Sequence, residues 1–272
     1  MDIIQRNFFR LLRSGALNEY ESPEPMSAFK WHRLADMIKT QQVEQYAVKG
    51  IKNCQFDKAF NMPDDVMHKL TSQQGDANDN GNEKDRKSPT LSNIFLRRRL
   101  RSIRHNERHA IDTSTETLTI LDIIVENTNH ILQQGISLND AMTLGRFLRT
   151  KGDRIDFVKL ESWIRKLRLQ RMAKLQASIL VAVFNFEPSE LPFCDRIERA
   201  AYKLTLRTLT HNEKDYASAW HFRQSHSGFI RNDSTFLRRN LRRSMRYFEY
   251  APLETMSSLV GNFVHALAEI EE

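Results

Sequence analysis

The chain has 272 residues, with 41 Lys or Arg against 34 Asp or Glu, which gives a formal net charge of +7. With 40% apolar and 28% charged residues, the composition is that of a globular protein and excludes the disordered and fibrous classes. Nine Gly and seven Pro are too few for a turn-rich all-β fold, so long helices are favoured.

Helical periodicity dominates residues 1–71, which we expect to form an N-terminal helical segment. The first helix begins near the N-terminus, with Gly15 as its expected stop. Ser27 is placed to cap a second helix, and Pro63 suits the first turn of a short third one. Residues 72–90 contain a single apolar residue, so we expect a mobile polar linker there.

Residues 91–272 predict a C-terminal helical domain that packs with residues 1–71. Residues 170–185 are apolar on most sides, which is typical of a central, buried helix. Further helices are predicted at about 195–209, 213–225 and 234–249. Four other helices in this domain have recognisable start signals at their first residues, namely Ser92, Thr113 to Glu116, Ser137 and Asp156.

The last predicted helix begins at Pro252 and carries apolar residues at alternating three- and four-residue steps: Leu253, Met256, Val260, Phe263, Leu267 and Ile270. Such a stripe is typical of a helix that packs against another helix, either inside this chain or in a second copy. We expect the first arrangement, because ordinary surface helices bury such stripes in their own domain. Together the elements predict a mainly α fold, a multi-helix bundle of about ten helices with little or no β-sheet.

Two arginine-rich segments, at 95–101 and 236–242, have nearly the same sequence, and in both we expect apolar residues to anchor a helix while arginines cover its other face. Guanidinium groups can hold phosphates through two parallel hydrogen bonds. Near the second segment, Tyr247, Phe248 and Tyr250 could stack on bases. The alternative is that the arginines form a solvated face and pair with acids of neighbouring helices. The candidate phosphate or nucleic-acid ligands are Lys49, Arg97, Arg98, Arg101, Arg238, Arg239, Arg242 and Arg243.

A metal or cofactor site is not expected. His105 and His109 lie four residues apart on a predicted helix, but no third ligand is near them in sequence. Asp64 and Asp65 follow Pro63, where acids normally complement a helix N-terminus. The two cysteines exclude a disulfide scaffold and a four-cysteine zinc site. Neither the glycine-rich phosphate loops nor the Gly-x-Ser-x-Gly turn of hydrolases occurs in the sequence.

The location expected from the sequence is the cytoplasm. The first residues lack the basic stretch and apolar run of a signal peptide. The longest nearly apolar stretch, residues 177–186, is too short for a transmembrane segment. The low cysteine content fits a reducing compartment.

Several segments, taken in order, are similar to those of a known family. Residues 7–14 and 29–34 match its first helical pair, and Val48-Lys49-Gly50 matches a Leu-Lys-Gly step into a catalytic core. Residues 135–138, 152–156, 187–193 and 246–252, with 269–272, match its later helices and the tail of one subgroup. In this order the chain resembles the uncharacterised bacterial nucleotidyltransferase-like proteins, whose helical flanks enclose a small α/β core.

The chain departs from that family at the chemistry. Nucleotidyl transfer needs a Gly-Ser turn for the triphosphate and an Asp-x-Asp pair that holds two metal ions, and the sequence contains neither. Residues 51–90, where the resemblance would place the catalytic strands, are largely polar linker. The resemblance therefore implies a non-catalytic relative that acts as a binding or interaction module, with a protein or a phosphate-bearing molecule as its partner. The alternatives are a nucleic-acid or phosphate binder that uses the Arg-rich helices, a cryptic nucleotidyltransferase, and a protein that binds anionic membrane surfaces.

Overall fold

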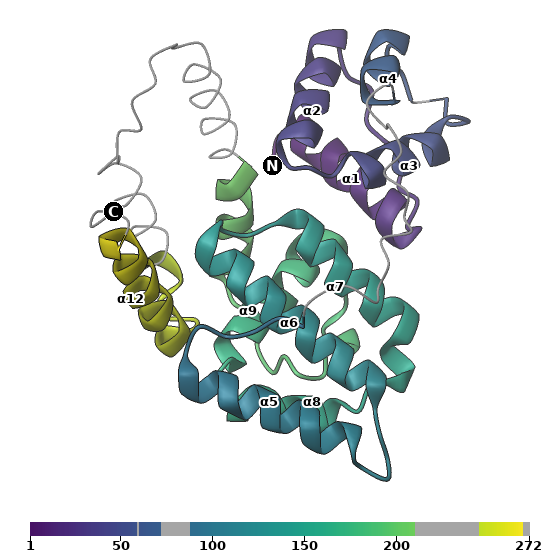
Figure 1. Cartoon of the computed structure of the whole chain (residues 1–272). Coiled ribbons are helices and arrows are strands. Elements are labelled where there is room, and N and C mark those ends of the chain that lie inside the picture. Colours follow the sequence, from purple (N-terminus) through teal and green to yellow (C-terminus); the bar gives the residue numbers. More distant parts are fainter. Residues whose placement is uncertain (59, 72–87, 210–244, 269–272) are drawn as a thin grey trace. The chain divides into compact units, whose positions relative to one another are not determined.

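The computed structural model describes residues 1–58, 60–71, 88–209 and 245–268, and for residues 261–268 the backbone alone. Over the described residues the chain is helical and contains no β-strand, so the predicted mainly α fold is confirmed (Figure 1). These residues fall into two compact units, one with residues 1–71 and 206–209, the other with 88–205 and 245–268. The boundary between residues 87 and 88 lies inside the segment 72–90 that the sequence marks as a linker. Packing of the C-terminal domain against residues 1–71 stays a prediction.

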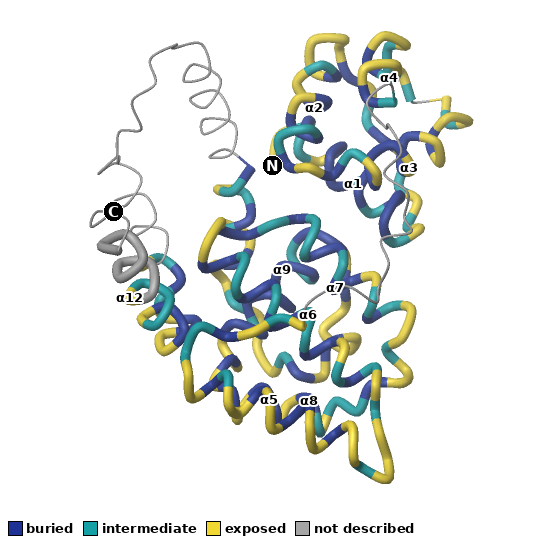
Figure 2. Tube along the Cα trace, viewed as in Figure 1, coloured by how far each residue is buried: buried dark blue, intermediate teal, exposed yellow. Residues whose placement is uncertain are grey.

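The first unit contains helices α1 (Ile3–Leu17), α2 (Ala28–Thr40), α3 (Glu44–Cys54) and α4 (Asp64–Thr71). The α1 helix begins after Asp2, whose carboxylate accepts a hydrogen bond from the Gln5 backbone N–H at 2.8 Å. It ends at Asn18, a residue with a φ of 57°, in the left-handed region that Asn tolerates better than most residues. Large side chains fill the core between these helices, with Phe8 and Trp31 fully buried. Each of the four helices has buried positions, coloured dark blue in Figure 2.

The prediction that Gly15 ends α1 is wrong, because this glycine lies at the contact between α1 and α3. A Cβ atom added at Gly15 would lie 1.8 Å from the Tyr46 carbonyl oxygen, and one at Gly50 would lie 2.0 Å from the Leu11 carbonyl oxygen. The two backbones therefore touch where no side chain fits. The sequence predicts no helix at α3, which the resemblance treats as a step into a catalytic core.

The second unit contains the helices α5 (Ile94–Arg108), α6 (Thr115–Gln133), α7 (Leu138–Lys151), α8 (Phe157–Lys166), α9 (Gln170–Phe184) and α12 (Pro252–Ala268), with two single 3-10 turns, η1 (Gly152–Arg154) and η2 (Pro188–Glu190). As predicted, α9 is a central helix: Met172, Leu175 and Leu180 are fully buried. It makes contacts with α6, α7 and α8, so it holds these helices together.

Two of the predicted caps are confirmed. The Ser137 hydroxyl accepts a hydrogen bond from the Asp140 N–H at 3.3 Å, and the Asp156 carboxylate accepts one from the Lys159 N–H at 2.9 Å. The prediction that Ser92 caps α5 is wrong by one residue, because the Asn93 side chain accepts bonds from the N–H groups of the second and third residues of the helix at 3.0 and 3.1 Å. Ser27 occupies the N-cap position of α2, but its side chain makes no capping hydrogen bond.

The predicted helix at 195–209 begins later than expected, since helical residues run from 200 to 209. Upstream, the Glu198 N–H donates to the Ser178 hydroxyl at 2.8 Å, a tertiary contact that holds this stretch outside the helix. The predicted helix at 213–225 lies outside the described residues. Of the one at 234–249, the described part is helical at 245–247 and turns at 248–250.

The α12 helix begins at Pro252 as predicted, but its apolar stripe does not pack inside the second unit over the side chains that are described. Leu253, Met256 and Val260 are 44%, 52% and 58% exposed. The face that α12 buries carries Glu254 and Thr255 instead. Polar contacts rather than the stripe therefore fix this helix. No described helix, α12 included, has both the length and the apolar character needed to cross a membrane.

Candidate phosphate-binding surface

The α5 helix carries six arginines and is held in one orientation by its apolar side. Leu96, Leu100 and Ile103 are buried in the core of the second unit. Its N-terminus is fixed by Asn93 and also by Glu254 of α12, whose carboxylate accepts hydrogen bonds from the N–H groups of Ser92 and Asn93. Because the side with the leucines faces the core, the position of each arginine around the helix decides whether it lies close to the rest of the unit or is exposed to solvent.

Arg104 and Arg97 are structural. Arg104 is buried, and its guanidinium donates to the Asp122 carboxylate at 2.6 and 3.0 Å and to the Pro89 carbonyl at 2.6 Å. Burial raises the pKa of Asp122, and the ion pair with Arg104 only partly offsets that rise. Arg97, a predicted ligand, is half-buried and donates to the Leu91 and Ser92 carbonyls at 2.8 and 3.4 Å. These bonds hold the chain before α5 and leave Arg97 poorly placed to bind phosphate.

The other four arginines of α5, Arg98, Arg99, Arg101 and Arg108, are exposed. Arg98 and Arg101 make no hydrogen bond or ion pair with any residue in the described part of the chain. The one acid of α5, Glu107, is buried, accepts a bond from the Ser114 N–H at 2.7 Å and lies 3.5 Å from the Lys159 ammonium. The exposed half of α5 is therefore basic, with its only acid turned inward.

The α8 helix lies near α5 (Figure 1), and the contacts at its two ends show that the two helices run in opposite directions. At one end the Arg99 guanidinium donates to the Lys166 carbonyl at 3.0 Å, and at the other Lys159 reaches the Asp112 carbonyl at 2.9 Å. Lys166 is exposed at the end of α8 nearest Arg99. A shallow depression of about 390 Å³ runs along α8, lined by Val158, Glu161, Ser162, Arg165 and Lys166. We call Arg98, Arg99, Arg101, Arg108 and Lys166 the α5–α8 basic surface.

Two histidines extend this surface. His105 and His109 are exposed, and their rings stack with centroids 4.4 Å apart and planes 24° from parallel. A hydrogen bond of 2.7 Å joins the His109 Nδ1 to the His105 carbonyl oxygen. Stacked rings do not aim their nitrogens at one point, and no group of three or more His, Cys, Asp or Glu side chains suited to a metal ion occurs among the described residues. The pair adds aromatic area beside the arginines.

The other predicted ligands lie elsewhere. Lys49 belongs to the first unit, where its ammonium donates to the Asn18 side-chain oxygen at 3.2 Å. Arg238, Arg239, Arg242 and Arg243 lie outside the described residues. Of the aromatic residues expected to stack on bases, Tyr247 and Tyr250 are buried, which contradicts that role. The Tyr250 ring instead packs under the Arg171 guanidinium, 5.4 Å from its centroid.

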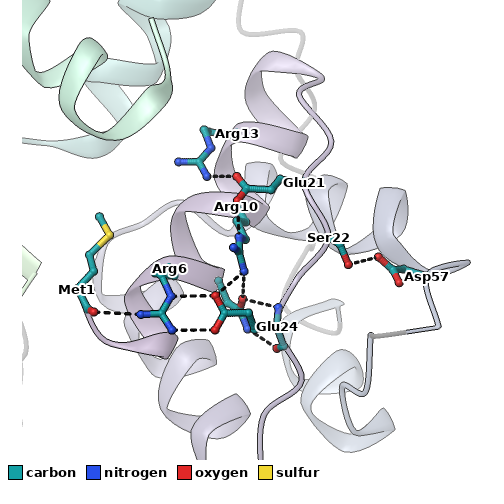
Figure 3. Close-up of polar contacts among 9 residues, drawn as sticks. Met1, Arg6, Arg10, Arg13, Glu21, Ser22, Glu24 and Asp57 are labelled. Atoms are coloured by element: carbon teal, nitrogen blue, oxygen red, sulfur yellow. Dashed lines mark hydrogen bonds and ion pairs between the residues drawn. The ribbon is translucent and has the colours of Figure 1, made fainter.

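A second set of arginines, on α1, is already neutralised (Figure 3). Arg6 and Arg10 reach the Glu24 carboxylate at 2.8 Å, while Arg10 and Arg13 bind Glu21. Hydrogen bonding from Arg6 lowers the pKa of Glu24 to about 2. Burial would raise the pKa of Glu21, but the bonds from Arg10 and Arg13 outweigh it and lower that pKa. These arginines hold the segment between α1 and α2 in place through ion pairs. The exposed Arg98 and Arg101 of α5 make no such pairs with the described residues.

Sequence reasoning selected Arg98 and Arg101 but missed Arg99, Arg108 and Lys166. Arg108 was within reach, because Arg98, Arg101, His105 and Arg108 follow steps of three, four and three along one helix face. Lys166 joins them through the hydrogen bond from Arg99 to its carbonyl, for which the sequence gives no local signal. Comparison of the chain with protein-family models, with curated proteins and with solved structures gives no match.

Proposed function

We propose that the chain is a non-catalytic binding module that contacts the phosphates of a nucleic acid through the α5–α8 basic surface. The proposal rests on a contrast between the arginines of α5. Arg97 and Arg104 are hydrogen-bonded to other groups of the second unit, whereas Arg98 and Arg101 have no partner among the described residues. Guanidinium groups left exposed in a fixed row are suited to phosphate oxygens.

The length of the row suits a nucleic-acid backbone. From Arg98 to Arg108 the helix rises about 15 Å at 1.5 Å per residue. That distance matches roughly four phosphates of one strand, which are spaced by about 3.4 Å along the axis of a duplex. The exposed Phe95, on the same half of α5, offers an aromatic ring to an unpaired base.

A nucleic acid fits this surface better than an anionic membrane does. A helix that lies on a membrane buries its apolar face among the acyl chains. The apolar face of α5 is occupied, since Leu96, Leu100 and Ile103 are buried in the second unit. What α5 presents between Arg98 and His109 is cationic or polar throughout.

The non-catalytic part of the proposal is supported by Lys49 and Gly50. In the family that the sequence resembles, this step leads into the catalytic core. Here Gly50 packs against the Leu11 carbonyl and Lys49 is hydrogen-bonded to Asn18, so both residues serve the contact between helices. Calorimetric titration with Mg-ATP and Mg-CTP tests this part. We expect no saturable heat, and saturable binding of either would favour the cryptic nucleotidyltransferase.

The binding itself is tested by replacing two arginines at once. In Arg98→Ala/Arg101→Ala we expect the affinity for fluorescent DNA and RNA oligonucleotides, measured by anisotropy at low salt, to fall about tenfold or more, equal to at least about 1.4 kcal/mol. Both side chains are exposed, so the circular dichroism spectrum should not change.

The matched control is Arg196→Ala/Arg199→Ala, which removes the same charge from two exposed arginines of the same unit. It should bind like the wild type. Equal weakening in both variants would show that net charge alone attracts the ligand. Binding to phosphatidylserine vesicles without binding to either oligonucleotide would replace the nucleic acid by a membrane and overturn the proposal.

A further inference from the structure

The exposed face of α5 has a central stripe in which aromatic and cationic side chains lie in one row. At 3.6 residues per turn, the members of the stripe fall within about 80° of one another around the helix. The stripe consists of Phe95, Arg98, Ser102, His105 and His109. All five residues are exposed, with Arg101 and Arg108 flanking them on one side and Arg99 on the other. The stripe therefore offers ring surface between guanidinium groups.

The rings of this stripe are open to solvent. Phe95 is 71% exposed, and its ring stacks on no other ring in the described part of the chain. His105 and His109 stack on each other, with centroids 4.4 Å apart, and both remain exposed. Packing inside the second unit accounts for Leu96 and Leu100 of the same helix, but it accounts for none of these rings.

The spacing along α5 pairs each ring with a guanidinium group. Residues three or four apart on a helix have Cβ atoms about 5–6 Å from each other. Phe95 lies three residues before Arg98, and His105 lies four after Arg101 and three before Arg108. A base stacked on the ring and a phosphate bound by the arginine can therefore belong to one nucleotide or to two neighbours. From Phe95 to His105 the helix rises about 15 Å, so one strand along α5 meets both pairs.

We propose that the α5–α8 basic surface binds unpaired nucleic acid, with bases stacked on Phe95 and on the His105–His109 pair. This inference rests on the proposed phosphate contacts and specifies the form of nucleic acid that makes them. A single strand exposes the faces of its bases, and these faces stack on aromatic side chains whatever the base. In a duplex the same faces are covered by the neighbouring base pairs, so the rings of the stripe have nothing to stack on.

The width of the surface also favours a single strand. The major groove of a duplex is about 12 Å wide and admits one α-helix, which with its side chains is about 10–12 Å across. The α5–α8 basic surface extends over two helices, since the Arg99 guanidinium donates to the Lys166 carbonyl at 3.0 Å and Lys166 is exposed. A duplex therefore meets the arginines through its phosphates alone, whereas a flexible single strand reaches the rings as well.

Anisotropy of a fluorescent pyrimidine strand, alone and annealed to its complement, tests the stacking with the full chain at one salt concentration. We expect the wild type to bind the single strand more tightly than the duplex. Phe95→Ala should weaken binding of the single strand about fivefold or more and leave binding of the duplex within about twofold of the wild type. Phe95→Leu keeps apolar bulk without a ring and should behave like Phe95→Ala, whereas Phe95→Trp should bind at least as tightly as the wild type.

The matched control is Phe29→Ala, which removes a phenylalanine of α2 that is 69% exposed and should bind both forms like the wild type. A tighter complex with the duplex, or a Phe95→Ala protein that loses affinity for both forms equally or for neither, would overturn the stacking and leave the phosphate contacts of Arg98 and Arg101 standing. Unchanged binding of both forms by Arg98→Ala/Arg101→Ala would instead overturn the proposed function, so the two failures are distinguishable.

Discussion

Glu24 shows how one side chain ties a segment without regular structure to a helix. Its carboxylate accepts hydrogen bonds from Arg6 and Arg10, and its backbone N–H and carbonyl pair with the Asn7 side chain at 2.8 and 2.7 Å. The folded state thus favours the ionised carboxylate, and its pKa drops from 4.5 to about 2. The stabilisation is present above the unfolded pKa and is lost as the pH falls through the folded one.

This gives a prediction for acid pH. Glu24→Gln should lower the stability of the chain above about pH 4.5, and the difference from the wild type should shrink steadily as the pH falls towards about 2. Urea unfolding curves of both proteins at several pH values measure that difference. Glu161→Gln serves as the control, because the Glu161–Arg165 pair is exposed and should contribute little at any pH. A difference between Glu24→Gln and wild type that does not vary with pH would contradict the assignment.

At the scale of the helices, the contact between α1 and α3 depends on two glycines. Gly50→Ala should destabilise the chain by about 1–3 kcal/mol or more, because the new Cβ would overlap the Leu11 carbonyl, which belongs to the backbone of α1 and cannot move alone. Hydrogen exchange followed by mass spectrometry should show the faster exchange in peptides from α1 and α3.

The same substitution at Gly152 should act in the opposite direction. This residue has helical angles, a φ of −52° and a ψ of −42°, and no atom lies within 4 Å of the position of an added Cβ. Gly152→Ala should therefore raise the free energy of unfolding by about 0.4–1 kcal/mol, since it restricts the unfolded chain. Equal changes in the free energy of unfolding for Gly50→Ala and Gly152→Ala would contradict the difference in surroundings between the two glycines.

The sequence predicts what is decided locally. Ser137 and Asp156 cap their helices by bonds to residues three positions away, so the caps can be seen in a short stretch of sequence. The contact that fixes the start of α5 comes from Glu254, 161 residues from Asn93, and no local pattern reveals it. The close approach at Gly15 is likewise a property of two helices together, and its local pattern suggested a helix end.

The same distinction applies to the candidate surface. Helical spacing places Arg98 and Arg101 on the polar half of α5, and the structure agrees. Spacing alone does not separate Arg97, which is half-buried and bonded to the preceding backbone, from its exposed neighbours. An arginine becomes structural when the fold places an acid or a carbonyl from another part of the chain within hydrogen-bond distance of it, as it places Asp122 beside Arg104.

Across the described part of the molecule, some clusters of positive side chains are neutralised by acids and others are not. The α1 arginines hold Glu21 and Glu24, whereas α5 keeps its acid buried and four of its six arginines exposed. A net charge of +7 attracts any polyanion weakly, but a fixed row of cations releases a defined number of counterions when it binds phosphates. The number released can be measured.

The salt dependence of DNA binding is therefore the most direct test. With five cations on the α5–α8 basic surface, a plot of log K against log salt concentration for a duplex should have a slope of roughly −4.5, at about 0.9 per phosphate contact. Arg98→Ala/Arg101→Ala should make the slope shallower by roughly 2, while Arg196→Ala/Arg199→Ala should leave it unchanged. Equal slopes for the wild type and Arg98→Ala/Arg101→Ala would contradict the assignment of this surface to phosphate binding.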